Sequence, residues 1–95
     1  MATKLHLDGN RINSEAELHD EITKQLKPPV YGRNLDALDE VMIQMVEPPI
    51  EVVWTNASKS KKVLGDRFEK FVAVFRDAEA RYGPGEYHFL VRMDP

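Results

Sequence analysis

Three carboxylates stand close together behind a tight turn in the first half of this 95-residue chain. Asp36 is followed by Asp39 three residues later and by Glu40 four residues later. In a helix these spacings make the side chains neighbours on one face, with about 5–6 Å between Cβ atoms. Like charges repel at this distance, and each such pair costs an isolated helix about 0.2–0.5 kcal/mol. The cluster therefore indicates an anionic surface that binds a cationic partner.

The same acids also have a simpler interpretation. Asn34 is a good N-cap residue, so Asp36 and Asp39 would lie near the start of the helix, where the positive end of the helix dipole favours negative charge. This interpretation requires no partner, and it stays open beside the first. On the first interpretation, the carboxylates would form charge-assisted hydrogen bonds with basic side chains of another molecule.

Outside this cluster, few residues of the chain are arranged for catalysis or metal binding. His6, His19 and His88 are scattered, and no Gly-x-Ser-x-Gly, His-Glu-x-x-His or phosphate-binding glycine motif lies near any of them. The chain has no cysteine, which excludes disulfides and thiolate metal sites. Paired carboxylates can catalyse glycoside hydrolysis, but Asp36 and Glu40 would lie on an exposed helix face of a chain too small to enclose a sugar. We therefore expect no enzyme activity, no cofactor and no metal site.

A strand and a helix are expected before the acidic cluster. Residues 3–7 alternate between polar and apolar and are followed by turn residues at 8–10, a pattern typical of a strand. Ser14 and Glu17 form a capping box, which predicts a helix over residues 14–26. This helix would end before Pro28-Pro29.

The acidic cluster itself is expected on a helix over residues 34–46. The loop before it, residues 28–33, contains two prolines and one glycine and should be stiff. Apolar residues recur along the helix at steps of three and four and form one buried stripe: Leu35, Leu38, Met42 and Met45. The acids would consequently point away from the core.

The second half of the chain predicts a strand, a polar segment, a long helix and a last strand. The segment over residues 50–54 is short, β-branched and largely apolar, as in a strand that is covered on both faces. Residues 56–63 are polar and fit a loop with a short helical turn, on which Lys59, Lys61 and Lys62 form a solvated group. A helix is expected over residues 66–82, and the break after it is formed by Gly83, Pro84 and Gly85. In the last strand Tyr87, Phe89 and Val91 alternate with Glu86, His88 and Leu90.

This order of elements favours an α/β fold with a small three-stranded parallel sheet and packed helices, in the order β-α-α-β-(α)-α-β. Its length fits a single domain over residues 1–95. The N-terminus lacks the apolar segment of a signal peptide, and no stretch is apolar enough to span a membrane, so a cytoplasmic location is expected.

Charge is unevenly distributed along the chain, whose net charge is −3. Residues 1–50 carry five basic and nine acidic side chains, a balance of −4, whereas residues 51–95 carry eight and seven, a balance of +1. Around the cluster Arg33 is the one basic residue that opposes the acids between residues 32 and 47. An acidic surface repels phosphates, so direct binding of nucleic acid is disfavoured.

The segment from Tyr31 to Leu38 resembles a known family. Seven of its eight positions stand as they do in the barstar family of intracellular ribonuclease inhibitors, namely Tyr31-Gly32 and Asn34-Leu35-Asp36-Ala37-Leu38. Weaker matches follow the same order along the chain: Leu18-His19, Val46-Glu47, Pro49, Trp54 and Val74-Phe75-Arg76. The sequence thus resembles this family almost from end to end.

The resemblance implies a barstar-like fold and inhibition of a small microbial ribonuclease of the barnase-like, guanyl-specific class. In this family the loop and the second helix enter the ribonuclease active site, where acidic side chains take the place of RNA phosphates. It further implies a one-to-one protein complex, a monomer when free, no membrane contact, and a cis peptide bond between Pro48 and Pro49. The partner-binding residues that it implies are Val30, Tyr31, Gly32, Asn34, Asp36, Asp39, Glu40 and Asp77.

Some of these positions have structural alternatives or depart from the family pattern. Asn34 could act only as a cap, Gly32 only as a turn residue and Tyr31 only in core packing. Val30 replaces an aromatic residue, and Asp39 stands where the founding member has tryptophan. Glu40 and Asp77 keep the family's charge but change its reach by one methylene. We therefore expect a ribonuclease partner other than that of the founding member, and the alternative is an interaction or immunity protein that binds a basic partner of another kind.

Overall fold

The computed structural model describes residues 3–83, 85 and 87–95, and all structural statements below refer to these residues. Pro84 and Glu86, which the sequence places at the break and at the start of the last strand, lie outside them. The elements are β1 (Thr3–Asp8), α1 (Glu15–Leu26), α2 (Leu35–Glu40), a π-helical turn (Val41–Met45), β2 (Ile50–Thr55), α3 (Ala57–Leu64), α4 (Arg67–Tyr82) and β3 (Phe89–Met93).

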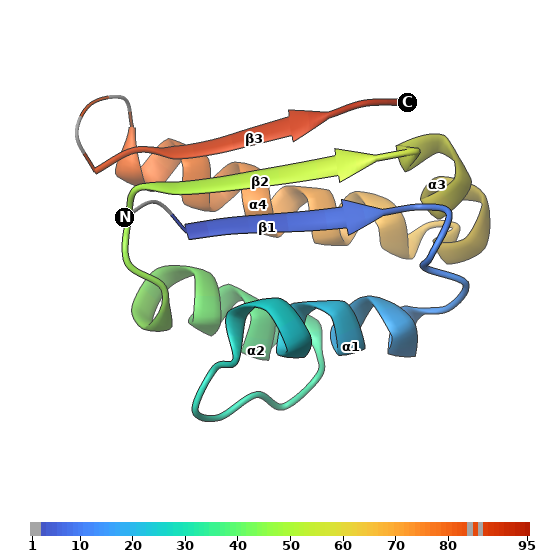
Figure 1. Cartoon of the computed structure of the whole chain (residues 1–95), viewed down its shortest axis with the longest axis horizontal. Coiled ribbons are helices and arrows are strands. Elements are labelled where there is room, and N and C mark those ends of the chain that lie inside the picture. Colours follow the sequence, from blue (N-terminus) through green and yellow to red (C-terminus); the bar gives the residue numbers. More distant parts are fainter. Residues whose placement is uncertain (1–2, 84, 86) are drawn as a thin grey trace.

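The three strands form one parallel sheet in the order β1-β2-β3 (Figure 1). Leu5 of β1 lies opposite Val52 of β2, which in turn lies opposite Val91 of β3. Parallel strands need crossover connections, and here helices supply them. The predicted α/β fold with a small three-stranded parallel sheet is therefore confirmed.

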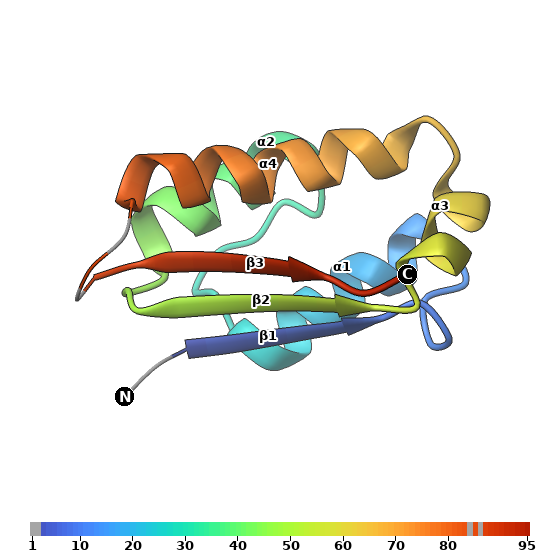
Figure 2. The same ribbon diagram turned by 90° about the horizontal axis from the view of Figure 1, so that it is seen from above.

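The core lies between one face of the sheet and the helices. α4 runs along that face, and α1 lies beside β1 (Figures 1 and 2). Trp54 of β2 packs edge-on against Phe68 and Phe75 of α4 and donates its indole N–H to Ser60 Oγ at 2.9 Å. A buried indole N–H needs such a partner, because leaving it unpaired would cost about 1–3 kcal/mol.

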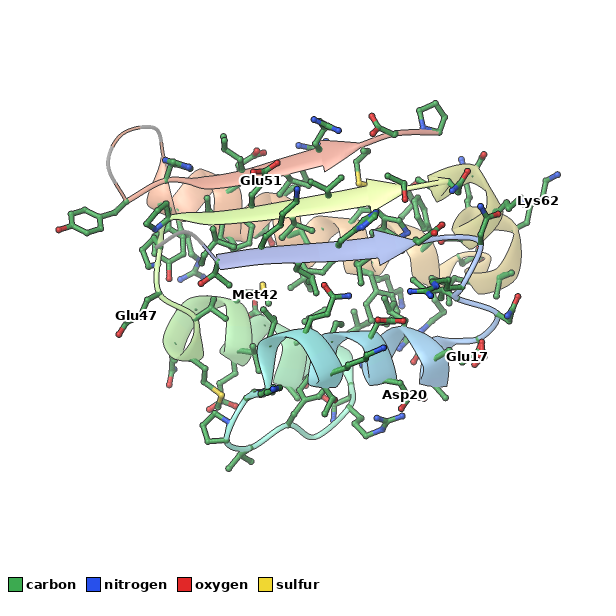
Figure 3. The ribbon with its side chains drawn as sticks, in the orientation of Figure 1. Glu17, Asp20, Met42, Glu47, Glu51 and Lys62 are labelled. Carbon is green, nitrogen blue, oxygen red and sulfur yellow. The ribbon has the colours of Figure 1, made fainter. Side chains whose placement is uncertain are left out.

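The prediction that β2 is covered on both faces was wrong. The second face carries Lys4, His6 and Arg92, which are exposed, and Glu51 also projects from it (Figure 3). Val53 on this face is nevertheless only 5% exposed, because it lies in register between His6 and Arg92. Val53 is thus buried on a face over which no helix of the described residues lies (Figure 1).

The acidic helix is shorter and less regular than the predicted helix over residues 34–46. After Glu40 the chain forms a π-helical turn, in which Val46 N donates to Val41 O at 3.1 Å. This shift leaves carbonyl groups without their usual helical partners, and the Tyr82 hydroxyl donates to Met42 O at 3.4 Å and Ile43 O at 3.2 Å. Figure 3 shows Met42 between this turn and the sheet.

Two further boundaries differ from prediction. Residues 57–64 form the helix α3, which extends the short helical turn predicted for this segment, and its buried side consists of Ala57, Ser60 and Leu64. The exposed lysines 59, 61 and 62 thus lie on a helix. β3 begins at Phe89, and Tyr87 lies before it and is 65% exposed.

The peptide bond between Pro48 and Pro49 is cis, as the resemblance implies. No described helix combines the length and the apolar character that crossing a membrane requires.

Candidate functional site

The acidic helix α2 begins directly after the loop over residues 27–34, and Asn34 fixes its first turn. Asn34 has extended backbone angles, and its Oδ1 accepts a hydrogen bond from Ala37 N at 2.7 Å. This contact pairs one of the N–H groups that a helix leaves free at its start. The structural role foreseen for Asn34 as a cap is therefore confirmed, and its side-chain oxygen is occupied.

The structure brings Asp36, Asp39 and Glu40 together on the outer face of α2. Leu38 is fully buried on the opposite face, Asp36 and Glu40 are exposed, and Asp39 is partly buried. Within the described residues no cation lies within ion-pair distance of any of the three. The three carboxylates therefore remain unneutralised next to one another.

Arg33, the basic residue nearest to the cluster, does not neutralise it. Its Nη2 lies 2.8 Å from Asp20 Oδ1 and donates to Ala16 O at 3.1 Å. Both partners belong to α1, so this side chain ties the loop to that helix, and Asp20 lies on the side of α1 that faces away from the sheet (Figure 3). Arg33 also has a left-handed backbone with φ of 57°.

Tyr31 anchors the loop to the core through His19. Its hydroxyl lies 2.5 Å from His19 Nδ1, and the His19 ring packs edge-on against Phe71 at 5.6 Å. Burial raises the pKa of Tyr31 and lowers the pKa of His19. Tyr31 is thus half-buried and engaged within the chain, which accords with the alternative that it packs on the core.

Sequence reasoning assigned His19 no functional role and missed its contact with the candidate site residue Tyr31. A signal was present, because His19 follows Leu18 and precedes Ile22 by three residues, within the apolar stripe of the first helix. A histidine in such a stripe is buried, and here it is only 3% exposed. Its partner could not be read from the sequence, because the contact depends on the path of the loop.

Within the described residues, no hydrogen bond or ion pair joins the other candidate residues Val30, Gly32 and Asp77 to the acids of α2. Val30 is 72% exposed in the loop. A Cβ on Gly32 would meet Ala37 Cβ at 3.4 Å, an ordinary contact, so the space around Gly32 does not demand glycine. Asp77 is exposed on α4, which packs against α2, and it has no ion-pair partner among the described residues.

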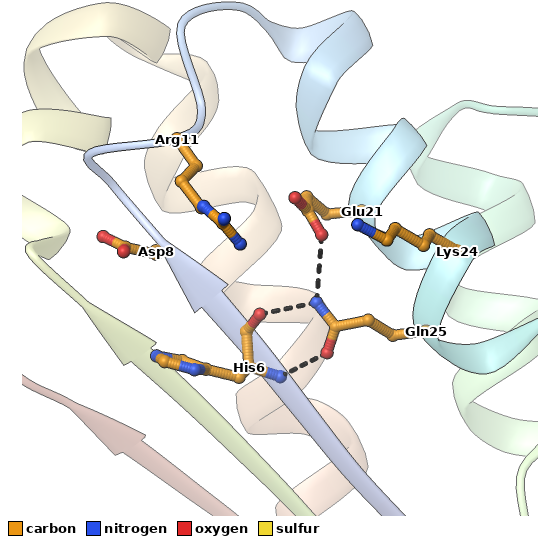
Figure 4. Close-up of a pocket in the computed structure, with 6 residues that line it drawn as sticks. All are labelled: His6, Asp8, Arg11, Glu21, Lys24 and Gln25. Carbon is orange, nitrogen blue, oxygen red and sulfur yellow. Dashed lines mark hydrogen bonds between the residues drawn. The ribbon is translucent and has the colours of Figure 1, made fainter.

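A separate polar pocket of about 290 Å³ lies between α1 and β1 (Figure 4). It is lined by His6, Asp8, Arg11, Glu21, Lys24 and Gln25. The His6 ring lies 3.0 Å from Thr55 Oγ1, and the Gln25 amide is held by the backbone of His6. Within the described residues no three potential ligands of histidine, cysteine or acidic type are placed to hold a metal ion.

Comparison with known proteins finds a family and a curated relative that this chain resembles. The profile of the Barstar family, described as barstar (barnase inhibitor), matches residues 2–94. The curated protein named "Putative ribonuclease inhibitor YrdF" from Bacillus subtilis (strain 168) is 32% identical over 77 residues, which cover 80% of this chain and 85% of that protein.

Proposed function

This chain belongs to the barstar family, and from that premise we propose that it inhibits a small microbial ribonuclease by blocking the active site. The loop over residues 27–34 and α2 enter the catalytic groove of the enzyme. Carboxylates of α2 occupy the positions where RNA phosphates would lie, and Asp36 is the central anion. The name of the Bacillus subtilis relative supports this class of partner.

The observation that carries this proposal is the unneutralised acidic face of α2. A ribonuclease must present arginine, lysine and histidine side chains to hold a phosphodiester. Against such a surface, Asp36, Asp39 and Glu40 offer complementary charge on a capped helix, so little ordering is needed on binding. Charge-assisted hydrogen bonds are about twice as strong as neutral ones, and opposite charges accelerate the encounter.

Titration of residual RNA cleavage tests the proposal. A guanyl-specific microbial ribonuclease is mixed with increasing amounts of the protein, and activity should fall linearly to an end point at one inhibitor per enzyme. Asp36→Asn removes one charge at nearly constant shape and should raise the concentration needed for half inhibition at least tenfold. Glu69→Gln is the matched control, because Glu69 is an exposed acid on α4 outside the site. Unchanged inhibition by Asp36→Asn would contradict the mechanism.

The partner is a ribonuclease other than barnase. Val30 offers a small apolar contact where the family pattern has an aromatic residue, and Asp39 adds a charge where the founding member has tryptophan. Both changes alter the surface that meets the enzyme. The cognate enzyme should therefore present an additional basic side chain opposite Asp39. In this role the protein would act in the bacterial cytoplasm as an immunity protein or antitoxin that protects the cell producing the ribonuclease.

The departures at Val30 and Asp39 also support a second candidate, an interaction or immunity protein that binds a basic partner without ribonuclease activity. The acidic face of α2 fits any rigid basic surface. Capture of partners from the native host with immobilised protein separates the two candidates. A captured protein that degrades RNA supports the first candidate. A captured protein without RNA cleavage activity that the Asp36→Asn variant no longer captures supports the second.

A further inference from the structure

The sheet has two edge strands, β1 and β3, whose outward backbone groups β2 does not use. Just before and just after β3, His88 O accepts from Ile50 N and Asp94 N donates to Trp54 O of β2. Successive residues of a parallel strand direct these groups to opposite sides, so Phe89, Val91 and Met93 direct theirs away from the sheet. A row of unpaired N–H and C=O groups is a template on which another strand can add.

Two side chains of α4 occupy the central outward groups of β3. Glu79 Oε2 accepts a hydrogen bond from Val91 N at 2.9 Å, and Arg76 Nη1 donates to Val91 O at 3.3 Å. The same Arg76 nitrogen lies 3.1 Å from Glu79 Oε1, so the two side chains also pair with each other. Together they offer Val91 one acceptor and one donor, as a neighbouring strand would.

At the β1 edge a side chain also pairs with outward backbone groups, but there a helix lies along the strand as well. Gln25 Oε1 accepts from His6 N at 2.8 Å, and Gln25 Nε2 donates to His6 O at 2.7 Å (Figure 4). Here α1 itself lies along the strand and blocks the approach of another strand (Figures 1 and 2). In the described part of the chain no helix lies along the outer side of β3, and its central outward groups are met by the two α4 side chains.

We propose that the Arg76–Glu79 pair guards the β3 edge and prevents a second copy of this chain from adding to the sheet. The strand is complementary to itself. An antiparallel pair with its two-fold axis at Val91 would place Phe89 opposite Met93 of the second copy, and all the outward groups would be used. Tyr87 and Leu90, which are 65% and 49% exposed, add apolar surface beside this edge.

Light scattering coupled to size-exclusion chromatography tests the guard. The unmodified chain should elute with the mass of one copy at every concentration. The double variant Arg76→Ala with Glu79→Ala should approach twice that mass as its concentration rises, because a two-fold pair closes and does not grow further. Glu79→Gln keeps an acceptor for Val91 N and should remain a monomer. A double variant that is folded by circular dichroism and stays monomeric at millimolar concentration overturns the proposal.

Two controls and a second measurement complete the test. Glu69→Ala with Lys70→Ala removes the same kinds of charge from the same helix, and Gln25→Ala opens the edge that α1 covers; both should stay monomeric. Hydrogen exchange gives an independent result, since the Val91 amide should exchange slowly in the unmodified monomer and faster in Glu79→Ala at low concentration. If both Glu79→Ala and the double variant unfold, the pair holds the fold together and the guard proposal is wrong.

Discussion

His19 combines burial with a titratable ring. Its Nδ1 faces the Tyr31 hydroxyl, whereas Nε2 is buried without a hydrogen-bond partner and lies 3.8 Å from Glu15 Oε2. Burial lowers the pKa of His19, the nearby Glu15 opposes this effect, and the positive charges of Arg33 and Arg67 add to it. The ring is therefore neutral in the folded protein at neutral pH, and Tyr31 can donate to Nδ1.

This burial predicts a loss of stability on mild acidification. Because the pKa of His19 in the folded protein lies below its ordinary value of 6.5, the unfolded chain binds a proton first as pH falls through that value. The free energy of unfolding should decrease from pH 6.5 to 5 by at most about 1.4 kcal/mol per pH unit. Urea denaturation at intervals of half a pH unit measures this change in the free energy of unfolding.

His19→Gln is the control for this prediction, because glutamine does not titrate. The variant should lose most of the slope between pH 6.5 and 5, whatever its stability at pH 7. Arg67 lowers the pKa of Glu15 below its ordinary value of 4.5, so the loss of that contact begins at lower pH and can be separated. A slope that is the same in both proteins would exclude His19 as its source.

Replacing Glu40 by a neutral residue should stabilise the free protein and weaken its inhibition of the ribonuclease. Glu40 stands four residues after Asp36, and the two exposed carboxylates repel each other in the free protein. Glu40→Gln should therefore raise the free energy of unfolding by about 0.2–0.5 kcal/mol and at the same time weaken inhibition of the ribonuclease. Urea denaturation and the RNA cleavage titration measure the two effects. An equally strong inhibitor would show that Glu40 does not meet the partner.

At the scale of elements, the short helix α2 depends on its cap. Six residues are too few for a stable isolated helix, so the contact from Asn34 Oδ1 to Ala37 N contributes a large share of its local order. Asn34→Ala should lower the free energy of unfolding by about 1 kcal/mol. Asn34→Asp keeps the cap and should restore most of that loss, as urea denaturation of the three proteins can show.

The π-helical turn after α2 leads to a second prediction at this scale. Tyr82→Phe removes the hydroxyl that serves Met42 O and Ile43 O and leaves both carbonyl groups without that donor. We expect the free energy of unfolding to fall by about 1–2 kcal/mol. Tyr87→Phe is the matched control, because Tyr87 is 65% exposed and its change should leave the stability as it is. Equal stability of all three proteins would show that water replaces the hydroxyl.

The sequence was sufficient for most elements because their patterns are local. Alternation revealed β1, and the spacing of Leu35, Leu38 and Met42 placed the carboxylates outward on α2. For α3 the sequence predicted only a short helical turn within a loop, since the buried side of this helix includes the small polar Ser60, whose partner Trp54 is known only from the fold. The π-helical turn was missed for the same reason, because its carbonyl groups are served by a residue of α4.

Long-range contacts explain what the sequence could not show of the site. The spacing of Asp36, Asp39 and Glu40 was enough to predict a shared acidic face. It could not show that Arg33 is engaged by α1, because the contact to Asp20 spans the loop. That contact keeps Arg33, the basic residue of segment 32–47, paired with α1 and away from the acids.

At the scale of the whole molecule, the acidic helix and the guarded strand edge are far apart. β3 forms the edge of the sheet opposite to α1 and α2 (Figure 1). A second copy paired along β3 would therefore leave the carboxylates of α2 open, and loss of inhibition in the guard variants would point to Asp77, which stands between Arg76 and Glu79 on α4. Oligomeric state and inhibition can be measured on the same variant as independent properties.

The uneven charge of the molecule predicts an association rate that depends on salt. The excess of acidic residues lies in the first half of the chain, and the carboxylates of α2 have no cation near them among the described residues. Attraction to a basic active site should accelerate the encounter at low ionic strength, and salt should reduce it because the screening length falls from about 10 Å at 0.1 M to about 3 Å at 1 M. Stopped-flow mixing with the ribonuclease should show an association rate that falls at least tenfold over this range, with a smaller change in the dissociation rate.

Asp39→Asn should flatten this dependence of the association rate on salt, whereas Glu69→Gln should leave it nearly unchanged. A rate independent of salt would mean that the acidic face of α2 does not guide the encounter.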